Sequence, residues 1–266
     1  MMFVHNLSPT FIDLGFFEIK WYSIAYILGI LIGWFWGKKI IFILEKKKIN
    51  LIKGAIFDNL ITTLIVSIIL GGRVGYVIFY NLEYYFANPL SIFKIWEGGM
   101  SFHGGLIGII LGVFWFAKKN NLNFLNLTDI ISCVAPIGLF LGRIANFING
   151  ELYGKTTNLI WGVIFPKIDN LTRHPSQLYE AFLEGIILFI ILNYFILKKN
   201  YIKGFVSSLF LVFYGCFRIF SEFFREPDVQ IGYILNFLSM GSILSIIMIL
   251  FGLIILVKIK KTNHVN

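Results

Sequence analysis

The chain has 266 residues, of which 58% are hydrophobic and only 14% are charged. A soluble domain of this size carries far more charge, so the composition excludes that class and predicts an integral membrane protein. The formal net charge is +9, which fits either nucleic-acid binding or a membrane-topology signal. The two cysteines, Cys133 and Cys216, lie in apolar runs without a CxxC partner. They therefore predict neither a disulfide framework nor a metal site.

Apolar runs that approach the length of a bilayer crossing recur along the whole chain. A hydrocarbon core of about 30 Å needs about 20 apolar residues per helix. The segment Met1–Lys20 lacks the basic start and the apolar centre of a cleavable signal peptide. The first long apolar run starts after it, and we expect that run to be retained as structure. The sequence predicts an all-α integral membrane fold with one polytopic domain over residues 1–266. Its seven predicted spans are Trp21–Trp36, Phe57–Tyr80, Met100–Phe116, Leu127–Phe147, Gln177–Leu197, Gly204–Phe224 and Leu238–Val257.

Lysines are concentrated in alternate loops, after the first, third, fifth and seventh spans. Because positively charged loops stay on the cytoplasmic side, we predict an N-terminus outside and a C-terminus in the cytoplasm. The basic excess is then a topology signal with contact to anionic lipid, and it argues against nucleic-acid binding. The lysines concerned are Lys38, Lys39, Lys46, Lys47, Lys48, Lys53, Lys118, Lys119, Lys198, Lys199, Lys203, Lys258, Lys260 and Lys261.

The outer side is predicted to carry a small irregular cap that contains strands, built from residues of about 1–20 and 152–174. Pro9–Lys20 indicates a short interfacial element. Leu152–Asn170, with its Gly, Thr and Pro residues, is typical of strands and turns. Ser176 is the expected N-cap of the fifth span, and Pro136 is expected to kink the fourth.

An unusually polar stretch, Gly142–Gly154, follows the apolar run of the fourth span. A guanidinium at hydrocarbon depth costs on the order of 3 kcal/mol, so Arg143 is expected to face a polar cavity. If the helix continues through the stretch, Arg143, Asn146 and Gly150 lie on one stripe. A cation, an amide and bare backbone would suit an anionic headgroup that approaches closely.

The sixth span carries a second polar stripe. Tyr214, Arg218, Glu222 and Arg225 follow one another at helical spacing along one face. Arg218 and Glu222 can pair with each other, and a structural ion pair between helices is the alternative to a binding role. The arginines Arg143, Arg218 and Arg73 nevertheless outnumber the acids available to neutralise them, of which Glu151 and Glu222 are the nearest. An excess of guanidinium favours a phosphate ligand.

Further candidates come from the other spans. His103 is the only histidine within a predicted span; its imidazole could accept a proton from a thiol or hydroxyl, or simply be hydrogen-bonded. Arg73 is either a second headgroup ligand or a snorkelling residue in a seam of glycines. Tyr26 lies deep for an interfacial tyrosine. Gln177 and Glu180 either line the same cavity or cap a helix.

Taken together, these motifs resemble the phosphatidylglycerol–prolipoprotein diacylglyceryl transferase family of bacterial membrane enzymes. They cover nearly the whole chain in the family's order, and the set is specific although each block alone is weak. The matching blocks are Trp21-Tyr22 through Tyr26, Gly71-Gly72-Arg73-Val74-Gly75-Tyr76, Trp96-Glu97-Gly98-Gly99-Met100-Ser101-Phe102-His103-Gly104-Gly105, Gly142–Gly154, His174-Pro175-Ser176-Gln177-Leu178-Tyr179-Glu180, and Tyr214 through Arg225-Glu226-Pro227-Asp228.

The resemblance implies a transferase without cofactor or metal, with seven spans and an outer N-terminus, in the bacterial cytoplasmic (inner) membrane. It implies transfer of the sn-1,2-diacylglyceryl group of phosphatidylglycerol to the lipobox cysteine thiol of a prolipoprotein. A thioether forms and glycerol phosphate leaves, as the first step of lipoprotein maturation. The partners are thus a lipid and a secreted precursor, with no nucleic acid. The resemblance assigns important positions to Tyr26, His103, Arg143, Asn146, Glu151, Gly154, Tyr214, Arg218 and Glu222.

On this interpretation His103 deprotonates the substrate thiol, while Arg143 and Arg218 clamp the phosphodiester. Tyr26 and Tyr214 complete the catalytic set, with Tyr214 orienting His103 or donating to a phosphate oxygen. An arginine-activated thiolate without a base is the alternative. The phosphatidylglycerol ligands expected besides the clamp are Arg73, Asn146, Glu151, Gly154 and Glu222.

The competing class is an anion or lipid transporter, in which buried Arg and His residues mark an ion path. We see no internal repeat that would favour it. Another lipid enzyme is the third possibility. A phosphotransferase needs an acidic metal cluster and a membrane protease needs a serine nucleophile in a convincing setting, and the sequence shows neither.

Overall fold

The computed structural model describes residues 3–15, 17–80, 82–95, 98–198, 201–227, 233–234 and 238–264. The blocks Trp96-Glu97 and Asp228 used above lie outside these ranges. Six of the described helices are long and apolar enough to cross a membrane, so the chain is a multi-pass membrane protein with a mostly helical fold. The predicted count of seven is not confirmed. The third predicted span corresponds to α4 (Phe102–Lys119), an 18-residue helix that ends in two lysines and is not among the six.

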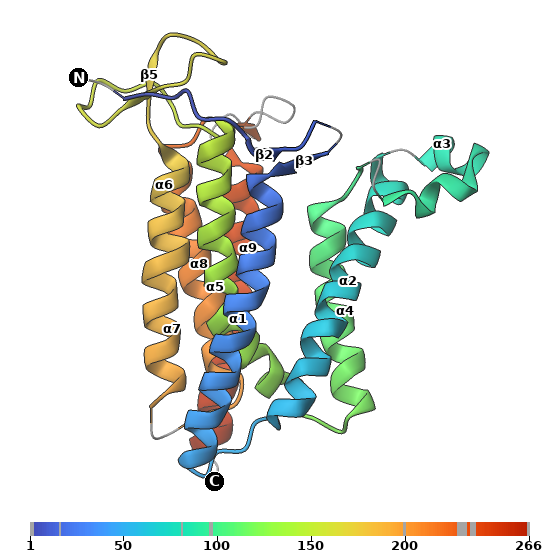
Figure 1. The fold of residues 1–266 in the computed structure, drawn as a ribbon. Coiled ribbons are helices and arrows are strands. Elements are labelled where there is room, and N and C mark those ends of the chain that lie inside the picture. Colours follow the sequence, from blue (N-terminus) through green and yellow to red (C-terminus); the bar gives the residue numbers. More distant parts are fainter. Residues whose placement is uncertain are drawn as a thin grey trace. The chain divides into compact units, whose positions relative to one another are not determined.

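The chain falls into two compact units, Met1–Ile40 with Asp129–Asn266, and Ile41–Thr128; each is described by itself. The first unit is a bundle of long helices with small strands at one end (Figure 1). Its helices are α1 (Trp21–Lys46), α5 (Phe124–Asn149), α6 (Ser176–Glu180), the π-helix η3 (Ala181–Ile187), α7 (Leu188–Ile196), α8 (Phe205–Glu222) and α9 (Met240–His264). The last residues of α1 and the first residues of α5 belong to the second unit.

Polar bonds tie the bundle together at the end away from the strands. Trp36 Nε1 donates to Asn193 Oδ1 at 2.8 Å, and Asn193 Nδ2 donates to the carbonyl of Cys133 at 3.1 Å. These bonds connect α1, α7 and α5. Nearer the middle, α1 and α5 approach closely, because a Cβ on Gly29 would lie 3.3 Å from the Cα of Gly138. Pro136 lies inside α5, which continues past it to Asn149.

Asp129 fixes the start of α8. Its carboxylate accepts from the Tyr201 hydroxyl and from the backbone N–H groups of Gly204 and Ser207, each at 2.7 Å. The first N–H groups of a helix lack acceptors within the helix. The buried Asp129 carboxylate of α5 is the acceptor for two N–H groups at the start of α8. Burial, together with the neighbouring carboxylate, raises the pKa of Tyr201, so the phenol stays protonated and remains a donor.

The strands form the predicted cap. β1 (Phe3–Val4) pairs in parallel with β4 (Val163–Ile164), which pairs antiparallel with β5 (Thr172–Arg173). The predicted interfacial element at Pro9–Lys20 is the antiparallel pair β2 (Thr10–Asp13) and β3 (Glu18–Lys20), with a register shift between Thr10 and Ile12. A third pair joins β6 (Tyr233–Ile234) and β7 (Leu238–Ser239).

The prediction that Ser176 caps the fifth span is wrong. Pro175 holds the N-cap position and Ser176 is the first helical residue. The Ser176 hydroxyl donates instead to the carbonyl of Leu152 at 2.9 Å. This bond attaches the start of α6 to the cap, and the Ser176 hydroxyl does not cap the N–H groups of α6.

The second unit contains α2 (Gly54–Tyr80), α3 (Leu82–Ala87), the 3₁₀-helix η1 (Pro89–Phe93) and α4. α2 and α4 pack through glycines, as predicted. A Cβ on Gly71 would lie 2.4 Å from the carbonyl oxygen of Gly104, and one on Gly108 would lie 2.2 Å from that of Ser67. Side chains at these positions would push the helices apart.

Candidate functional site

Two arginines on different helices meet over the same carboxylate. Arg143 Nη1 of α5 lies 2.8 Å from Glu180 Oε2, and Arg218 Nη1 of α8 lies 2.8 Å from Glu180 Oε1. Glu184, one turn further on, accepts from Arg143 Nη2 at 3.2 Å and lies 3.8 Å from Arg218 Nη1. The polar stripes of the fourth and sixth predicted spans therefore converge on Glu180 and Glu184.

The stripe on α8 continues toward the cap. Arg218 Nη2 forms an ion pair with Glu222, and Glu222 Oε1 accepts from Arg225 Nη1 at 3.2 Å. Gly241 on α9 leaves the room for this pair, because a Cβ there would lie 2.7 Å from Glu222 Oε1. Arg225 itself lies beyond the end of α8 and forms a backbone bridge with Gly154.

The expected excess of guanidinium is not what the structure shows. Arg143, Arg218 and Arg225 have ion pairs with Glu180, Glu184 and Glu222, so three cations face three carboxylates among the described residues. The sequence analysis named Glu151 and Glu222 as the nearest acids, left Glu180 as a cavity-lining or capping residue, and gave no role to Glu184. The signal was present: Glu180 and Glu184 are four residues apart in a helix, and Glu184 sits in an apolar run where a lone acid is costly.

Pairing does not exhaust the cluster's capacity to bind an anion. Both acids at the centre are fully buried, whereas the Arg143 side chain keeps 16% of its surface exposed. Its two bonded nitrogens are Nη1 and Nη2, and Nε has no partner among the residues that the structure describes. The accessible part of the cluster is therefore cationic, and an anion that reaches it meets Arg143 first.

A second polar group lies at the junction of α1, α5 and the cap. Asn146 Nδ2 donates to Glu151 Oε1 at 2.9 Å, and both contact the hydroxyl of Tyr22. The sequence analysis names Tyr22 only as part of a matching block and gives it no role, so Tyr22 is a member of this polar group that sequence reasoning missed. The predicted stripe through Gly150 is wrong, because α5 ends at Asn149 and Gly150 has a φ of 71°.

The two remaining tyrosine candidates differ in exposure. Tyr26 stacks on Tyr22 with ring centroids 6.1 Å apart and is 67% exposed. Tyr214 lies one turn before Arg218 on α8 and stacks on Phe210 at 5.6 Å. Its hydroxyl has no hydrogen-bond partner in the described part of the chain, so this donor is available beside the arginine cluster.

Gly154 is held tightly within the cap. Its N–H donates to the His174 carbonyl at 2.9 Å, and its carbonyl accepts from Arg173 Nη1 at 3.1 Å. A Cβ at this position would lie 2.5 Å from the same His174 oxygen and 2.6 Å from that of Phe224. The Gly154 N–H and carbonyl are therefore both hydrogen-bonded within the cap, which argues against the expected contact of this backbone with the headgroup. The missing side chain of Gly154 lets the backbones of His174 and Phe224 approach it closely.

The cap around Gly154 is closed by an ion pair. Arg173 Nη2 lies 2.6 Å from Asp169 Oδ2, and Arg173 Nη1 lies 3.3 Å from Glu226 Oε2. The hydrogen bonds from Arg173 hold the pKa of the Asp169 carboxyl below its usual value. The guanidinium also lies over the ring of Tyr153, 4.9 Å from its centroid. This network stabilises the segment that follows Gly154.

In the second unit, Arg73 is a structural residue. It is 4% exposed and donates to five backbone carbonyls. A guanidinium has five N–H groups, so none remains for a phosphate, which contradicts the expected headgroup role. Arg73 instead holds the segment between α2 and α4 in place. The five acceptors are the carbonyls of Ser91, Ile92, Lys94, Gly98 and Gly99.

His103 lies in the first turn of α4 and is exposed. Ser101 caps this helix by accepting from the N–H of Gly104 at 3.2 Å. His103 belongs to the second unit, Ile41–Thr128, whereas the arginine cluster belongs to the first. Among the residues that the structure describes, no group of three His, Cys, Asp or Glu side chains is arranged to hold a metal ion.

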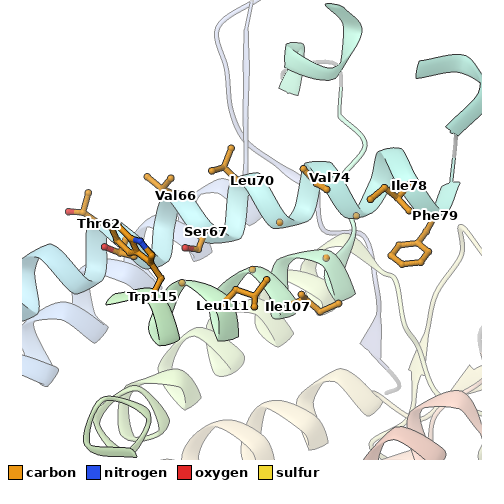
Figure 2. Close-up of a pocket in the computed structure, with 16 residues that line it drawn as sticks. Thr62, Val66, Ser67, Leu70, Val74, Ile78, Phe79, Ile107, Leu111 and Trp115 are labelled. Atoms are coloured by element: carbon orange, nitrogen blue, oxygen red, sulfur yellow. The ribbon is translucent and has the colours of Figure 1, made fainter. Parts of the chain in front are cut away.

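A groove of about 710 Å³ runs along the contact between α2 and α4 (Figure 2). Apolar side chains of both helices line it, among them Leu70, Val74 and Ile107, which are labelled in Figure 2. Glycines of both helices also line the groove. Neither Arg73 nor His103 lines it. The groove is therefore a feature of the helix seam and does not contain the candidate chemistry.

Comparison with known proteins decides the family. The family model described as prolipoprotein diacylglyceryl transferase matches residues 9–258. The chain belongs to this family. It is 54% identical over 255 residues to the phosphatidylglycerol–prolipoprotein diacylglyceryl transferase of Rickettsia bellii, covering 95% of each chain. It is 55% identical over 253 residues to the enzyme of that name from Rickettsia typhi, covering 94% of this chain and 96% of the relative.

Membership in the prolipoprotein diacylglyceryl transferase family favours the transferase interpretation over an anion or lipid transporter. The relatives are named for phosphatidylglycerol, a lipid with an anionic phosphodiester, and for a prolipoprotein.

Proposed function

We propose that this protein transfers the diacylglyceryl group of phosphatidylglycerol to the lipobox cysteine thiol of a prolipoprotein. The observation that carries the proposal is the convergence of Arg143 and Arg218 on Glu180 within an apolar helical bundle, in a chain of this family. Two guanidinium groups fixed beside each other at membrane depth suit a phosphodiester better than any other common lipid group.

The reaction balances without a cofactor. The cysteine S–H bond and the bond between the glyceryl carbon and the phosphate oxygen break, and a sulfur–carbon bond forms. The thiol proton passes to a base and then to solvent, because the departing glycerol phosphate has a second pKa of about 6 and is mostly a dianion near neutral pH. The product pair is a thioether-linked diacylglyceryl protein and glycerol phosphate. The first step of lipoprotein maturation has this form.

Arg143 and Arg218 stabilise the charge that collects on the leaving phosphate. Arg143 is the more exposed of the two and makes the first contact with the headgroup. Asn146 lies in the last turn of α5 and Glu151 lies just after the helix. Held together with Tyr22, they orient the glycerol hydroxyls of the headgroup. Glu222 holds Arg218 in place. Arg73 and Gly154 support the fold and are not placed in contact with substrate.

His103 is proposed as the base for the incoming thiol, on its chemistry alone. A free thiol of pKa about 8.5 is mostly protonated at neutral pH, and a neutral imidazole can accept that proton. Tyr214, with its available hydroxyl, donates to a phosphate oxygen, and Tyr26 borders the headgroup from α1. A His103→Gln enzyme should lose most of its rate near neutral pH. An unchanged rate and pH profile would instead assign thiol activation to an arginine.

We also propose seven spans, with the N-terminus outside and the C-terminus in the cytoplasm of the bacterial inner membrane. In the first unit, Trp36 in the second half of α1 and the carbonyl of Cys133 in the first half of α5 both bond to Asn193. The chain therefore leaves and re-enters this unit at the same end, away from the cap. Because α2 crosses the membrane, a second crossing must return the chain, and α4 is the helix available for it.

One assay tests the proposed function. Purified protein is mixed with phosphatidylglycerol and a lipobox peptide, and mass spectrometry measures the peptide product. We expect a mass increase equal to one diacylglyceryl group, and no product from the same peptide with its cysteine replaced by alanine. Release of glycerol phosphate with the alanine peptide would indicate lipid hydrolysis, and absence of any product would reject the proposal.

A further inference from the structure

Glu180 has an unusual position for a side chain in an apolar bundle. It is fully buried, and each of its oxygens lies 2.8 Å from a different arginine, one on α5 and one on α8. Neither oxygen makes a well-aligned hydrogen bond in the described structure. The carboxylate thus acts mainly as a charge placed between Arg143 and Arg218, two cations that would otherwise repel each other.

The local backbone places this carboxylate. The helix changes from α to π directly after Glu180, over Ala181–Ile187. A π segment widens a helix and is common at functional sites. Gly185 then allows the segment to press against α5, because a Cβ there would lie 2.7 Å from Cβ of Phe140. The wide helix and the close approach together bring two acids, Glu180 and Glu184, to the same side of α5.

The order of burial separates supporting groups from contact groups. Glu180 is completely buried, whereas the side chains of Arg143 and Arg218 keep 16% and 9% of their surface exposed. A ligand that approaches the cluster therefore reaches the guanidiniums before the carboxylate. Glu180 can influence the reaction only through the arginines that it holds.

We infer that Glu180 is a positioning residue for the transfer reaction. Its shared carboxylate sets the separation and orientation of Arg143 and Arg218, so that both face the phosphate as its charge increases. The inference rests on the proposed function of these arginines. Glu184 assists mainly through Arg143, because it lies 3.2 Å from that guanidinium and 3.8 Å from the other.

The role predicts a specific kinetic change in Glu180→Gln, which keeps the size of the side chain and removes its charge. The arginines separate, so the leaving phosphate is less well stabilised and kcat should fall by at least about tenfold. The site gains net positive charge, so KM for phosphatidylglycerol should stay the same or decrease. A residue needed only for folding would lower the fraction of active enzyme and leave KM and the kcat of the folded enzyme unchanged.

Two further variants complete the test. Glu180→Asp keeps the charge and most of the packing but is too short to reach both arginines, so its kcat should fall while the protein stays folded. Glu226→Gln is the matched control, because Glu226 pairs with Arg173 in the cap at 3.3 Å and is outside the proposed site. Its rate should equal that of the wild type.

All four enzymes are assayed with phosphatidylglycerol in detergent micelles and a lipobox peptide, with folding measured by thermal unfolding. A wild-type kcat per folded molecule in Glu180→Gln, or in Glu180→Asp if the first variant does not fold, overturns the inference. A raised KM with unchanged kcat also overturns it. An inactive wild type rejects the proposed function itself, which makes the two failures distinguishable.

Discussion

At the scale of single residues, the arginines of this protein have two different roles. Arg73 gives all its N–H groups to backbone carbonyls and holds a connection between helices. Arg143 and Arg218 share a carboxylate and keep part of their surface exposed. Burial of an arginine in a membrane protein therefore does not by itself indicate a ligand. The partner atoms decide, and only the second pair has donors left for a phosphate.

Replacement of Arg218 by lysine tests the clamp. Arg218→Lys keeps the charge and should allow folding, but an ammonium cannot form the planar two-point contact of a guanidinium. We expect kcat/KM for thioether formation to fall by about 100-fold, the size typical for loss of one preorganised donor to a developing anion. Arg173→Lys in the cap is the control and should remain active. Near-wild-type turnover of Arg218→Lys would argue against the clamp.

Gly154 illustrates a residue whose importance comes from space. Gly154→Ala places a methyl group 2.5 Å from the His174 carbonyl, so the cap must shift. Overpacking of this kind costs roughly 1–3 kcal/mol. We expect a lower temperature of thermal unfolding together with reduced activity.

Gly138 of α5 provides the comparison for this variant, because a Cβ there would have no atom within 4 Å. Gly138→Ala should be neutral or slightly stabilising, since alanine favours helix by about 1 kcal/mol over glycine. Equal unfolding temperatures for the two variants would show that the cap tolerates the methyl group.

At the scale of elements, polar side chains connect helix ends to one another. Asp129 of α5 accepts two N–H groups at the start of α8 and the hydroxyl of Tyr201. At the other end of the bundle, Ser176 attaches α6 to Leu152 of the cap. These bonds fix the axial position of helices whose apolar surfaces alone would allow sliding, and so they align the arginines of α5 and α8 with Glu180.

Removal of the Asp129 carboxylate should therefore loosen the bundle. Asp129→Ala leaves two backbone donors and one hydroxyl without their acceptor, a loss of roughly 1–3 kcal/mol. We expect a clear drop in the unfolding temperature in detergent, followed by circular dichroism. Glu45→Ala, at an exposed position of α1, should unfold like the wild type. If the two variants unfold alike, Asp129 does not fix the start of α8.

At the scale of the whole molecule, the number of membrane crossings determines whether the two chain termini lie on the same side of the membrane. An even number of spans places both ends on one side, and an odd number places them on opposite sides. The lysines lie at the ends of α1, α4, α7 and α9, and several rest over an aromatic ring one turn earlier, such as Lys38 over Trp34 at 4.9 Å. This arrangement is typical of cytoplasmic interfaces and agrees with α4 as a crossing.

Cysteine labelling measures this directly. In a Cys216→Ser background, a membrane-impermeant maleimide added to intact cells should label Leu90→Cys, in the connection before α4, and Lys167→Cys, in the cap. Lys119→Cys and Lys47→Cys should react only after the membrane is opened. Labelling of Lys119→Cys in intact cells would place both ends of α4 outside and remove the seventh span.

The sequence by itself determined the class of the protein, the approximate place of its long helices and the family, because apolar length and motif order are local properties of the chain. The tertiary structure decided which polar residues meet. Glu184 is 41 residues from Arg143, and Tyr22 is 129 residues from Glu151, so no sequence spacing reveals these partners. The same holds for Arg73 and Gly154, whose donors and acceptors are consumed by backbone groups that only packing brings to them.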